Sequence, residues 1–173
     1  MGFFTKPIKT LDDLLLHLLQ DIYYAEQQIT KALPRMIEKS GDPAVRSAFE
    51  AHLRETETQI GRLEQAFRLH GSEAKGATCQ AIDGIIKEAN EVASDVDDPE
   101  VLQVALVGSA QAVEHYEIAR YGTIIAIATQ LGRTDIADAL RPTLDEEKAT
   151  DRKLSALAEE RVNRQAAPVQ EPV

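Results

Sequence analysis

The stretch Glu114-His115-Tyr116-Glu117 lies in the middle of the most apolar run of the chain, residues 101–131. Apolar residues in this run recur at spacings of three and four, which is typical of one face of a long helix. Glu114 and Glu117 fall on or beside the apolar stripe, and their separation of three residues places them on one helix face. Bare carboxylates are costly to bury, whereas a divalent cation neutralises them and takes their oxygens as ligands. The stretch therefore predicts a buried metal site, provided that other helices supply matching ligands.

Composition and charge narrow the class of protein. A chain of 173 residues is expected to form one domain with a sizeable core. Its formal net charge of -10 argues against nucleic acid and anionic membranes as partners and is compatible with attracting cations. Residues 1–9 contain no apolar signal segment, and no run is long and apolar enough to cross a membrane, so we expect a soluble cytoplasmic protein. The single Cys79 rules out an internal disulfide and is expected to be a small core or boundary residue.

Capping residues, prolines and glycines divide the chain into five predicted helices, and no strand pattern is present. The expected limits are Thr10 to Gly41, Asp42-Pro43 to Gly71, about Cys79 to Val96, Asp98-Pro99 to Gly132, and a helix capped by Thr134 that runs to about residue 165. The third helix is shorter and is predicted to be a crossover. The fold class is therefore all-α, a four-helix bundle over residues 1–165 with an additional crossover helix, followed by a disordered tail at 166–173. Pro34 and Pro142 are expected to kink their helices or to end their regular part.

Each long helix carries acidic residues or a histidine where its apolar stripe should continue. Glu26 occupies a leucine position of the first stripe, and His52 and Glu55 share the apolar face of the second helix. Glu147 and Asp151 interrupt the last stripe four residues apart. By contrast, His115, Glu57 and Glu146 are expected to lie off these faces, the latter two in solvent. The four tyrosines are expected to be core aromatics with polar tips, although hydrogen bonding to the ligands or a radical relay are alternatives.

Short loops make the first two long helices antiparallel neighbours, and likewise the last two. Counting equal numbers of residues on either side of each turn places Glu26 level with about Thr56, beside Glu55, and Glu117 level with about Ala149, between Glu147 and Asp151. Carboxylates from four helices with an imidazole are the pattern of a di-metal site, and these ligands suit iron or manganese, with zinc as a further option. One or two of the candidates are expected to support the ligands rather than bind metal. The predicted metal-site residues are Glu26, His52, Glu55, Glu114, Glu117, Glu147 and Asp151.

Four segments around these residues resemble the YciE/YciF stress-protein family of the ferritin-like superfamily, along nearly the whole chain. The resemblance implies a ferritin-like bundle, a dinuclear metal site in which iron is the expected metal, a homodimer and a role in the stress response. The segments are Asp21-Ile22-Tyr23-Tyr24-Ala25-Glu26, His52-Leu53-Arg54-Glu55-Thr56-Glu57, Val113-Glu114-His115-Tyr116-Glu117 and Glu146-Glu147-Lys148-Ala149-Thr150-Asp151.

The ligand order differs from that of many ferritin-like oxidases, which present Glu-x-x-His on the second and last bundle helices. Here the second helix has the reverse order, His52-x-x-Glu55, and the last has Glu147-x-x-Thr150 and no histidine. Two functions therefore stay open. One is a di-metal carboxylate protein that oxidises Fe(II) or consumes peroxide. The other is a non-enzymatic helical stress or structural protein whose acidic core is vestigial or holds a structural metal.

Overall fold

Three of the long helices begin at residues whose side chains accept hydrogen bonds from the free backbone N–H groups of the first turn. In the computed structural model, which describes residues 7–167, α1 (Leu11–Lys39) begins with a capping box between Thr10 and Asp13. Asp42 and Asp98 cap α2 (Pro43–His70) and α4 (Pro99–Gln130), each with a proline at the first helical position. The starts of these three helices agree with the sequence pattern.

The last helix starts and ends slightly differently from the prediction. Thr134 is the first residue of α5 (Thr134–Leu157) and its N-cap is Arg133, so the prediction that Thr134 is the cap is wrong by one position. The helix continues through a π-helical segment, η1 (Ala158–Val162), into α6 (Asn163–Ala166), one residue beyond the predicted domain limit. Most of the predicted tail, residues 168–173, lies outside the described residues, as do residues 1–6 of the predicted domain.

The prolines and glycines within these segments act in two ways. Helices α1 and α5 continue past Pro34 and Pro142, so neither proline ends its helix. Gly71 ends α2 in the left-handed conformation, with φ of 82°, as the sequence predicts. Gly41 is not the stop of α1, because the helix is capped at Ser40 and Gly41 has no positive φ.

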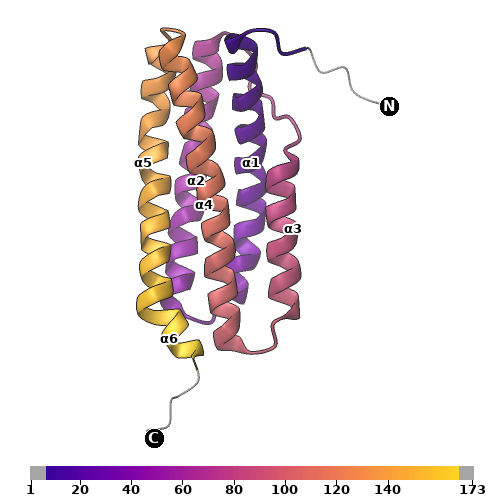
Figure 1. Cartoon of the computed structure of the whole chain (residues 1–173), viewed down its shortest axis with the longest axis vertical. Helices are drawn as coiled ribbons and strands as arrows, with labels where there is room; N and C mark the ends of the chain where they lie inside the picture. Colours follow the sequence, from indigo (N-terminus) through magenta and orange to yellow (C-terminus); the bar gives the residue numbers. More distant parts are fainter. Residues whose placement is uncertain (1–6, 168–173) are drawn as a thin grey trace, which may run out of the picture.

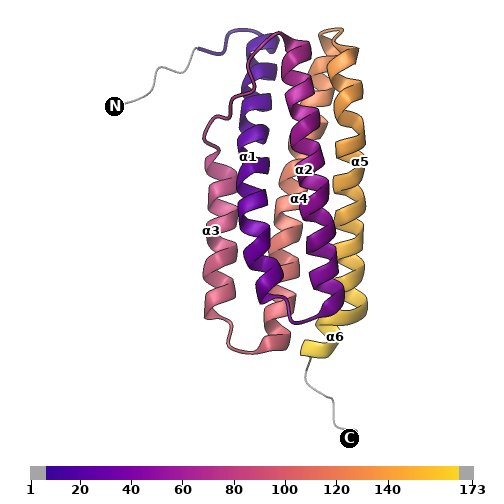
Figure 2. The same ribbon diagram turned by 180° about the vertical axis from the view of Figure 1, so that it is seen from behind.

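Helices α1, α2, α4 and α5 form a four-helix bundle in which every neighbouring pair is antiparallel (Figures 1 and 2). Helix α1 packs on α2 and α4, and α5 packs on the same two helices. The shorter α3 (Gln80–Asp95) lies outside the bundle against α1 and α4 and links the hairpin α1–α2 to the hairpin α4–α5. Within residues 7–167 there is no strand, so the prediction of an all-α bundle with a crossover helix is confirmed. None of the described helices is long and apolar enough to span a membrane.

Asp42 joins the start of α2 to the C-terminal segment. One carboxylate oxygen accepts from the backbone N–H groups of Ala44 and Val45, and the other accepts from Arg161 Nε at 2.6 Å. Burial disfavours the charged form, but Arg161 and the two N–H groups outweigh it and lower the pKa of Asp42. The carboxylate therefore caps one element and anchors another.

We expect Asp42→Ala to lower the free energy of unfolding by about 1–2 kcal/mol, because it removes a helix cap and the partner of Arg161. The matched control is Asp98→Ala, which removes the equivalent cap of α4. Urea denaturation of both variants isolates the contribution of the Arg161 contact. A loss in Asp42→Ala that is no larger than in Asp98→Ala would show that the contact adds nothing.

Candidate metal centre

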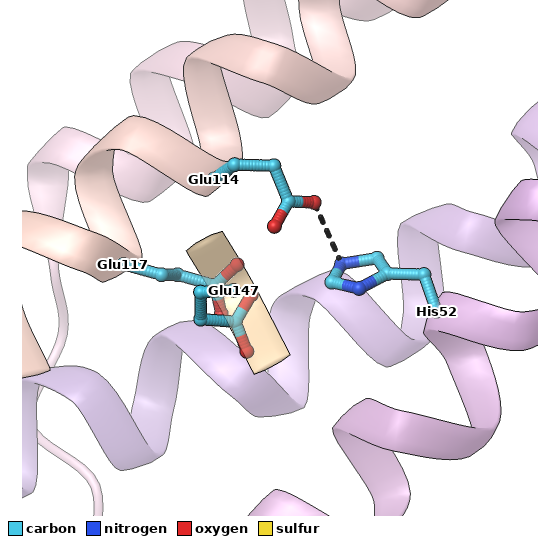
Figure 3. A group of neighbouring side chains, drawn as sticks. All are labelled: His52, Glu114, Glu117 and Glu147. Atoms are coloured by element: carbon cyan, nitrogen blue, oxygen red, sulfur yellow. Dashed lines mark ion pairs between the residues drawn. The ribbon is translucent and has the colours of Figure 1, made fainter. Parts of the chain in front are cut away.

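Four ligand-type side chains meet at mid-height in the bundle core (Figure 3). Glu114 and Glu117 come from α4, His52 from α2 and Glu147 from α5, and one potential ligand atom of each lies within 4.8 Å of the others. None of these residues is more than 3 % exposed. The i, i+3 spacing on α4 gives two carboxylates from one face, and the antiparallel packing of α2 on α5 brings the other two groups to the same level.

Glu26 of α1 borders this group of four. It is fully buried, and the hydroxyl of Tyr121 donates a hydrogen bond to its Oε1. Its charge interacts with Glu147 and with Glu117, and its Oε2 has no hydrogen-bond partner. All four long helices therefore contribute an acidic or imidazole side chain to one region of the core.

Most of the buried ligand-type atoms of this region lack hydrogen-bond partners. Both carboxylate oxygens of Glu114 and of Glu117, and one oxygen each of Glu26 and Glu147, are unpartnered. Both ring nitrogens of His52 also lack a hydrogen-bond partner, although Nε2 lies 3.3 Å from Glu114 Oε1. Buried polar groups without partners are rare in folded proteins because each costs about 1–3 kcal/mol. The donor set thus has the number and the type of free atoms that a cation requires.

The pKa values of these groups differ strongly from their ordinary values. Burial, followed by the charge of Glu147, raises the pKa of Glu26 to about 8 and that of Glu114 to about 11. Burial, followed by the charge of Glu26, raises the pKa of Glu117 well above its ordinary value. Burial also raises the pKa of Glu147 to about 7 and lowers the pKa of His52 to about 4. The imidazole is therefore neutral near pH 7, which is the form that binds metals. The carboxyls are expected to retain protons unless a cation neutralises them.

The sequence reasoning missed a second layer of residues that hold Glu147. The side-chain amide of Gln59 donates to Glu147 Oε1 and, at 3.2 Å, to Glu146 Oε2. Arg62 binds both oxygens of Glu146, at 2.5 and 2.8 Å. The prediction that Glu146 is merely solvated is therefore wrong. Gln59 follows His52 by seven residues, two helical turns, and this spacing was the available signal for it.

Tyr23 and Tyr121 are buried, Tyr24 and Tyr116 are half-buried against the core, and the hydroxyls of all four are hydrogen-bonded. Core aromatics with polar tips are therefore found, and one of the four, Tyr121, also makes the alternative contact, a hydrogen bond to a candidate ligand. Tyr121 reaches Glu26, whereas Tyr116 donates to Asp21 at 2.7 Å. Arg120 also pairs with Asp21, and its guanidinium lies over the Tyr116 ring. Cys79 is buried, as predicted, with Sγ 3.0 Å from the Tyr116 hydroxyl.

Glu55 and Asp151 are not in the group of four. Both are half-buried at its edge, where Glu55 accepts from Thr150 Oγ1 at 3.3 Å and Asp151 pairs with the exposed His115 at 3.1 Å. Their charges still reach the group, because Asp151 contributes to the raised pKa of Glu114 and Glu55 to that of Glu147. His115 points off the face of Glu114, as predicted.

A bundle of four long helices with an acidic core at its centre, covered on one side by a crossover helix, defines the class of protein. The chain belongs to the DUF892 family, described as a domain of unknown function, which matches residues 10–167. It is 45 % identical to protein YciF of Escherichia coli (strain K12) over 160 residues, which are 92 % of this chain and 96 % of YciF. The resemblance to the YciF family that the sequence motifs indicate is thereby confirmed.

Comparison with solved structures also places the chain beside YciF and shows the same fold in other relatives. The crystal structure of the E. coli stress protein YciF superimposes with a TM-score of 0.86, covering 91 % of this chain and 99 % of that one. YcfI from Rhodopseudomonas palustris, described as a candidate structural protein, is 55 % identical with a TM-score of 0.86, covering 88 % and 98 % of the two chains. A protein from Xanthomonas campestris that is 21 % identical has a TM-score of 0.70 over 89 % and 94 % of the chains and shares the fold.

Proposed function

We propose that the chain binds two transition-metal ions, with iron as the expected metal, between Glu26, His52, Glu114, Glu117 and Glu147. The observation that carries this proposal is the meeting of unpartnered carboxylate oxygens and a neutral imidazole in a buried core. Four carboxylates carry four negative charges, which two divalent ions balance. The charges of Glu117 and Glu147 interact with those of both Glu26 and Glu114, so all four carboxylates are close enough in space to hold the same pair of ions together with His52.

The donor set also bears on the choice of metal and on the chemistry. Oxygen ligands with one nitrogen favour iron or manganese, and zinc is a further option. Each Fe(II) ion of a pair would supply one electron, so the pair would supply the two electrons that reduce oxygen to hydrogen peroxide or hydrogen peroxide to water. The residues of the chain hold the ligands in place: Gln59 orients Glu147, and Tyr121 orients Glu26. Such supporting hydrogen bonds fix ligand geometry and typically change metal affinity by about 10–100-fold when removed.

The relatives support a role in stress. YciF of E. coli is named a stress protein, and this chain matches it over nearly the full length of both. We therefore extend the proposal to a ferritin-like stress protein that oxidises Fe(II) or consumes peroxide, working as a homodimer. The dimer has its own test, because analytical ultracentrifugation separates one copy from two.

A structural role is the second candidate. The R. palustris relative is described as a candidate structural protein, and the chain lacks the Glu-x-x-His pairs of many ferritin-like oxidases. In this case the centre would hold a metal without turnover, and its effect would be confined to stability.

Anaerobic titration with Fe(II), followed by mixing with oxygen or hydrogen peroxide, distinguishes these functions. We expect chelator-treated protein to bind about two Fe(II) per chain and then to develop ferric absorbance. Glu147→Gln is expected to lose binding because it removes a charge from the centre, whereas Glu55→Gln, a half-buried neighbour, is the matched control. Absence of Fe(II) uptake by the wild type would remove the metal proposal. Uptake without oxidation would favour the structural role.

A further inference from the structure

A narrow cavity of about 40 Å³ lies between α1, α3 and α4. Its walls are mainly apolar, with Leu33 from α1, Ile86 and Ala89 from α3, and Ala110 from α4. The exposed Arg35 also belongs to its lining, so the cavity extends from the surface into the bundle.

The inner end of the cavity is formed by His52 and Glu114. These residues are 3 % and 0 % exposed, and the ring nitrogens of His52 and the carboxylate oxygens of Glu114 lack hydrogen-bond partners. They are also half of the group of four that forms the candidate metal centre (Figure 3). The cavity therefore reaches one corner of that centre from the side covered by α3.

The lining indicates which molecules the cavity accepts. Apolar walls penalise the transfer of any ion from water. Arg35 and Lys39 at the lining add positive charge, which repels metal cations in particular. The volume admits only a few atoms, since one water needs about 10–15 Å³ on the same measure. These properties exclude metal ions and larger organic molecules and favour a small uncharged one.

We propose that this cavity is the binding and access site for a small uncharged molecule of the size of dioxygen or hydrogen peroxide. The molecule reaches the His52–Glu114 corner of the centre from the side of α3. The use of the site rests on the proposed metal centre, but its occupancy by a small apolar probe does not.

The proposal gives α3 a role beyond that of a crossover. Only Ile82 and Ala93 of this helix are buried, whereas Ile86 and Ala89 are half-buried and form the outer wall of the cavity. Lys39 Nζ donates to the backbone carbonyl of Ala93 at 2.7 Å and ties α3 to the end of α1. Helix α3 thus covers the cavity from outside without filling it.

Xenon is the probe for occupancy, because apolar cavities in proteins bind it without charge or hydrogen bonds. We expect crystals pressurised with xenon to show one atom between Leu33, Ile86 and Ala110 in the wild type. Ala110→Phe should abolish this peak, and Ala89→Leu fills the cavity from the opposite wall if the first variant fails to fold. Ala112→Phe, on the exposed face of α4, is the matched control and should keep the peak. No xenon in the wild type, or xenon retained in both filled variants, would overturn the proposal.

Oxidation of Fe(II)-loaded protein tests the use of the cavity. We expect filling variants to retain their Fe(II) content and to oxidise it at least roughly tenfold more slowly, a change of about 1.4 kcal/mol in the barrier. If the filling variants slow oxidation by oxygen but not by hydrogen peroxide, the cavity is a route for oxygen, and the reverse result makes it a route for peroxide. If oxidation by both is slowed, both molecules use the cavity. Unchanged rates with both oxidants in a variant that excludes xenon would overturn the access role. If the wild type binds no Fe(II), the metal proposal fails, and the xenon experiment alone still decides whether the cavity is a binding site.

Discussion

Replacing Glu114 and Glu117 together by Gln is expected to lower metal affinity by at least about 100-fold, a greater effect than loss of a supporting hydrogen bond would give. The two side chains supply four unpartnered oxygens from one face of α4, and glutamine preserves their size but removes their charge. Calorimetric titration of chelator-treated protein with Mn(II) measures the change. The matched control is the pair Glu55→Gln and Asp151→Asn, which removes two nearby charges that lie outside the group of four. An equal loss in the control would place the centre elsewhere.

The same double variant should be more stable than the wild type when both are free of metal at pH 8. Buried carboxylates without partners destabilise the folded state, either by carrying charge in a dry core or by holding protons against the solution pH. The two new amides can also donate to the unpartnered oxygens of Glu26 and Glu147. Loss of stability in the metal-free variant would contradict the view that these carboxylates are retained for binding rather than for folding.

The stability of metal-free protein is expected to fall as the pH rises from 7 to 9. The pKa of Glu26 is raised to about 8 and that of Glu114 to about 11, so the folded state holds protons in this range that the unfolded state, with its ordinary values near 4.5, has released. A carboxyl that stays protonated only in the folded state contributes stability that is complete below the unfolded pKa and is lost as the pH rises through the folded pKa. Glu114, which stays protonated in the folded state throughout this range, lowers the free energy of unfolding by about 1.4 kcal/mol per pH unit. Glu26 contributes less above pH 8, because it then releases its own proton.

Three other titratable groups near the centre or with shifted pKa values contribute little between pH 7 and 9. The pKa of His52 is lowered from 6.5 to about 4, so above pH 7 its imidazole is largely neutral in both states. The pKa values of Asp42 and Glu146 are lowered, and both carboxylates are ionised throughout this window. Urea denaturation at pH 7, 8 and 9 with a chelator measures the slope. Saturating Mn(II) should abolish it, because metal binding displaces the retained protons and the folded and unfolded states then hold equal numbers of protons on these carboxyls. A flat or rising stability in the chelator would contradict the raised pKa values.

The sequence was sufficient to predict the bundle because its signals are local. Thr10, Asp42 and Asp98 mark helix starts, and Gly71 marks an end, through hydrogen bonds formed within a few residues of each cap. Glu114 and Glu117 could be assigned to one buried face because three residues separate them on a helix. Equal counting from each turn then brought α1, α2, α4 and α5 into register at the level of Glu26 and Glu147.

The selection among neighbouring candidates could not be made from the sequence. Glu147 and Asp151 share a face of α5 but lie about 6 Å apart along the axis, and only Glu147 reaches the group of four. On α2 the structure selects His52 rather than Glu55, because the packing of α2 against α5 turns Glu55 toward Thr150. That packing joins segments far apart in the chain, which spacing within one helix does not reveal. For the same reason the contact of Gln59 with Glu147 and the cavity between α1, α3 and α4 could not be predicted from the sequence.

The anomalous scattering of iron in crystals loaded anaerobically with Fe(II) tests the proposed centre most directly, because it locates the metal. Two peaks about 3.5–4 Å apart are expected in the core. Both should lie among the side chains of Glu26, His52, Glu114, Glu117 and Glu147. Peaks confined to surface carboxylates, with the core side chains ordered and metal-free, would contradict the proposal that this acidic core is a metal centre.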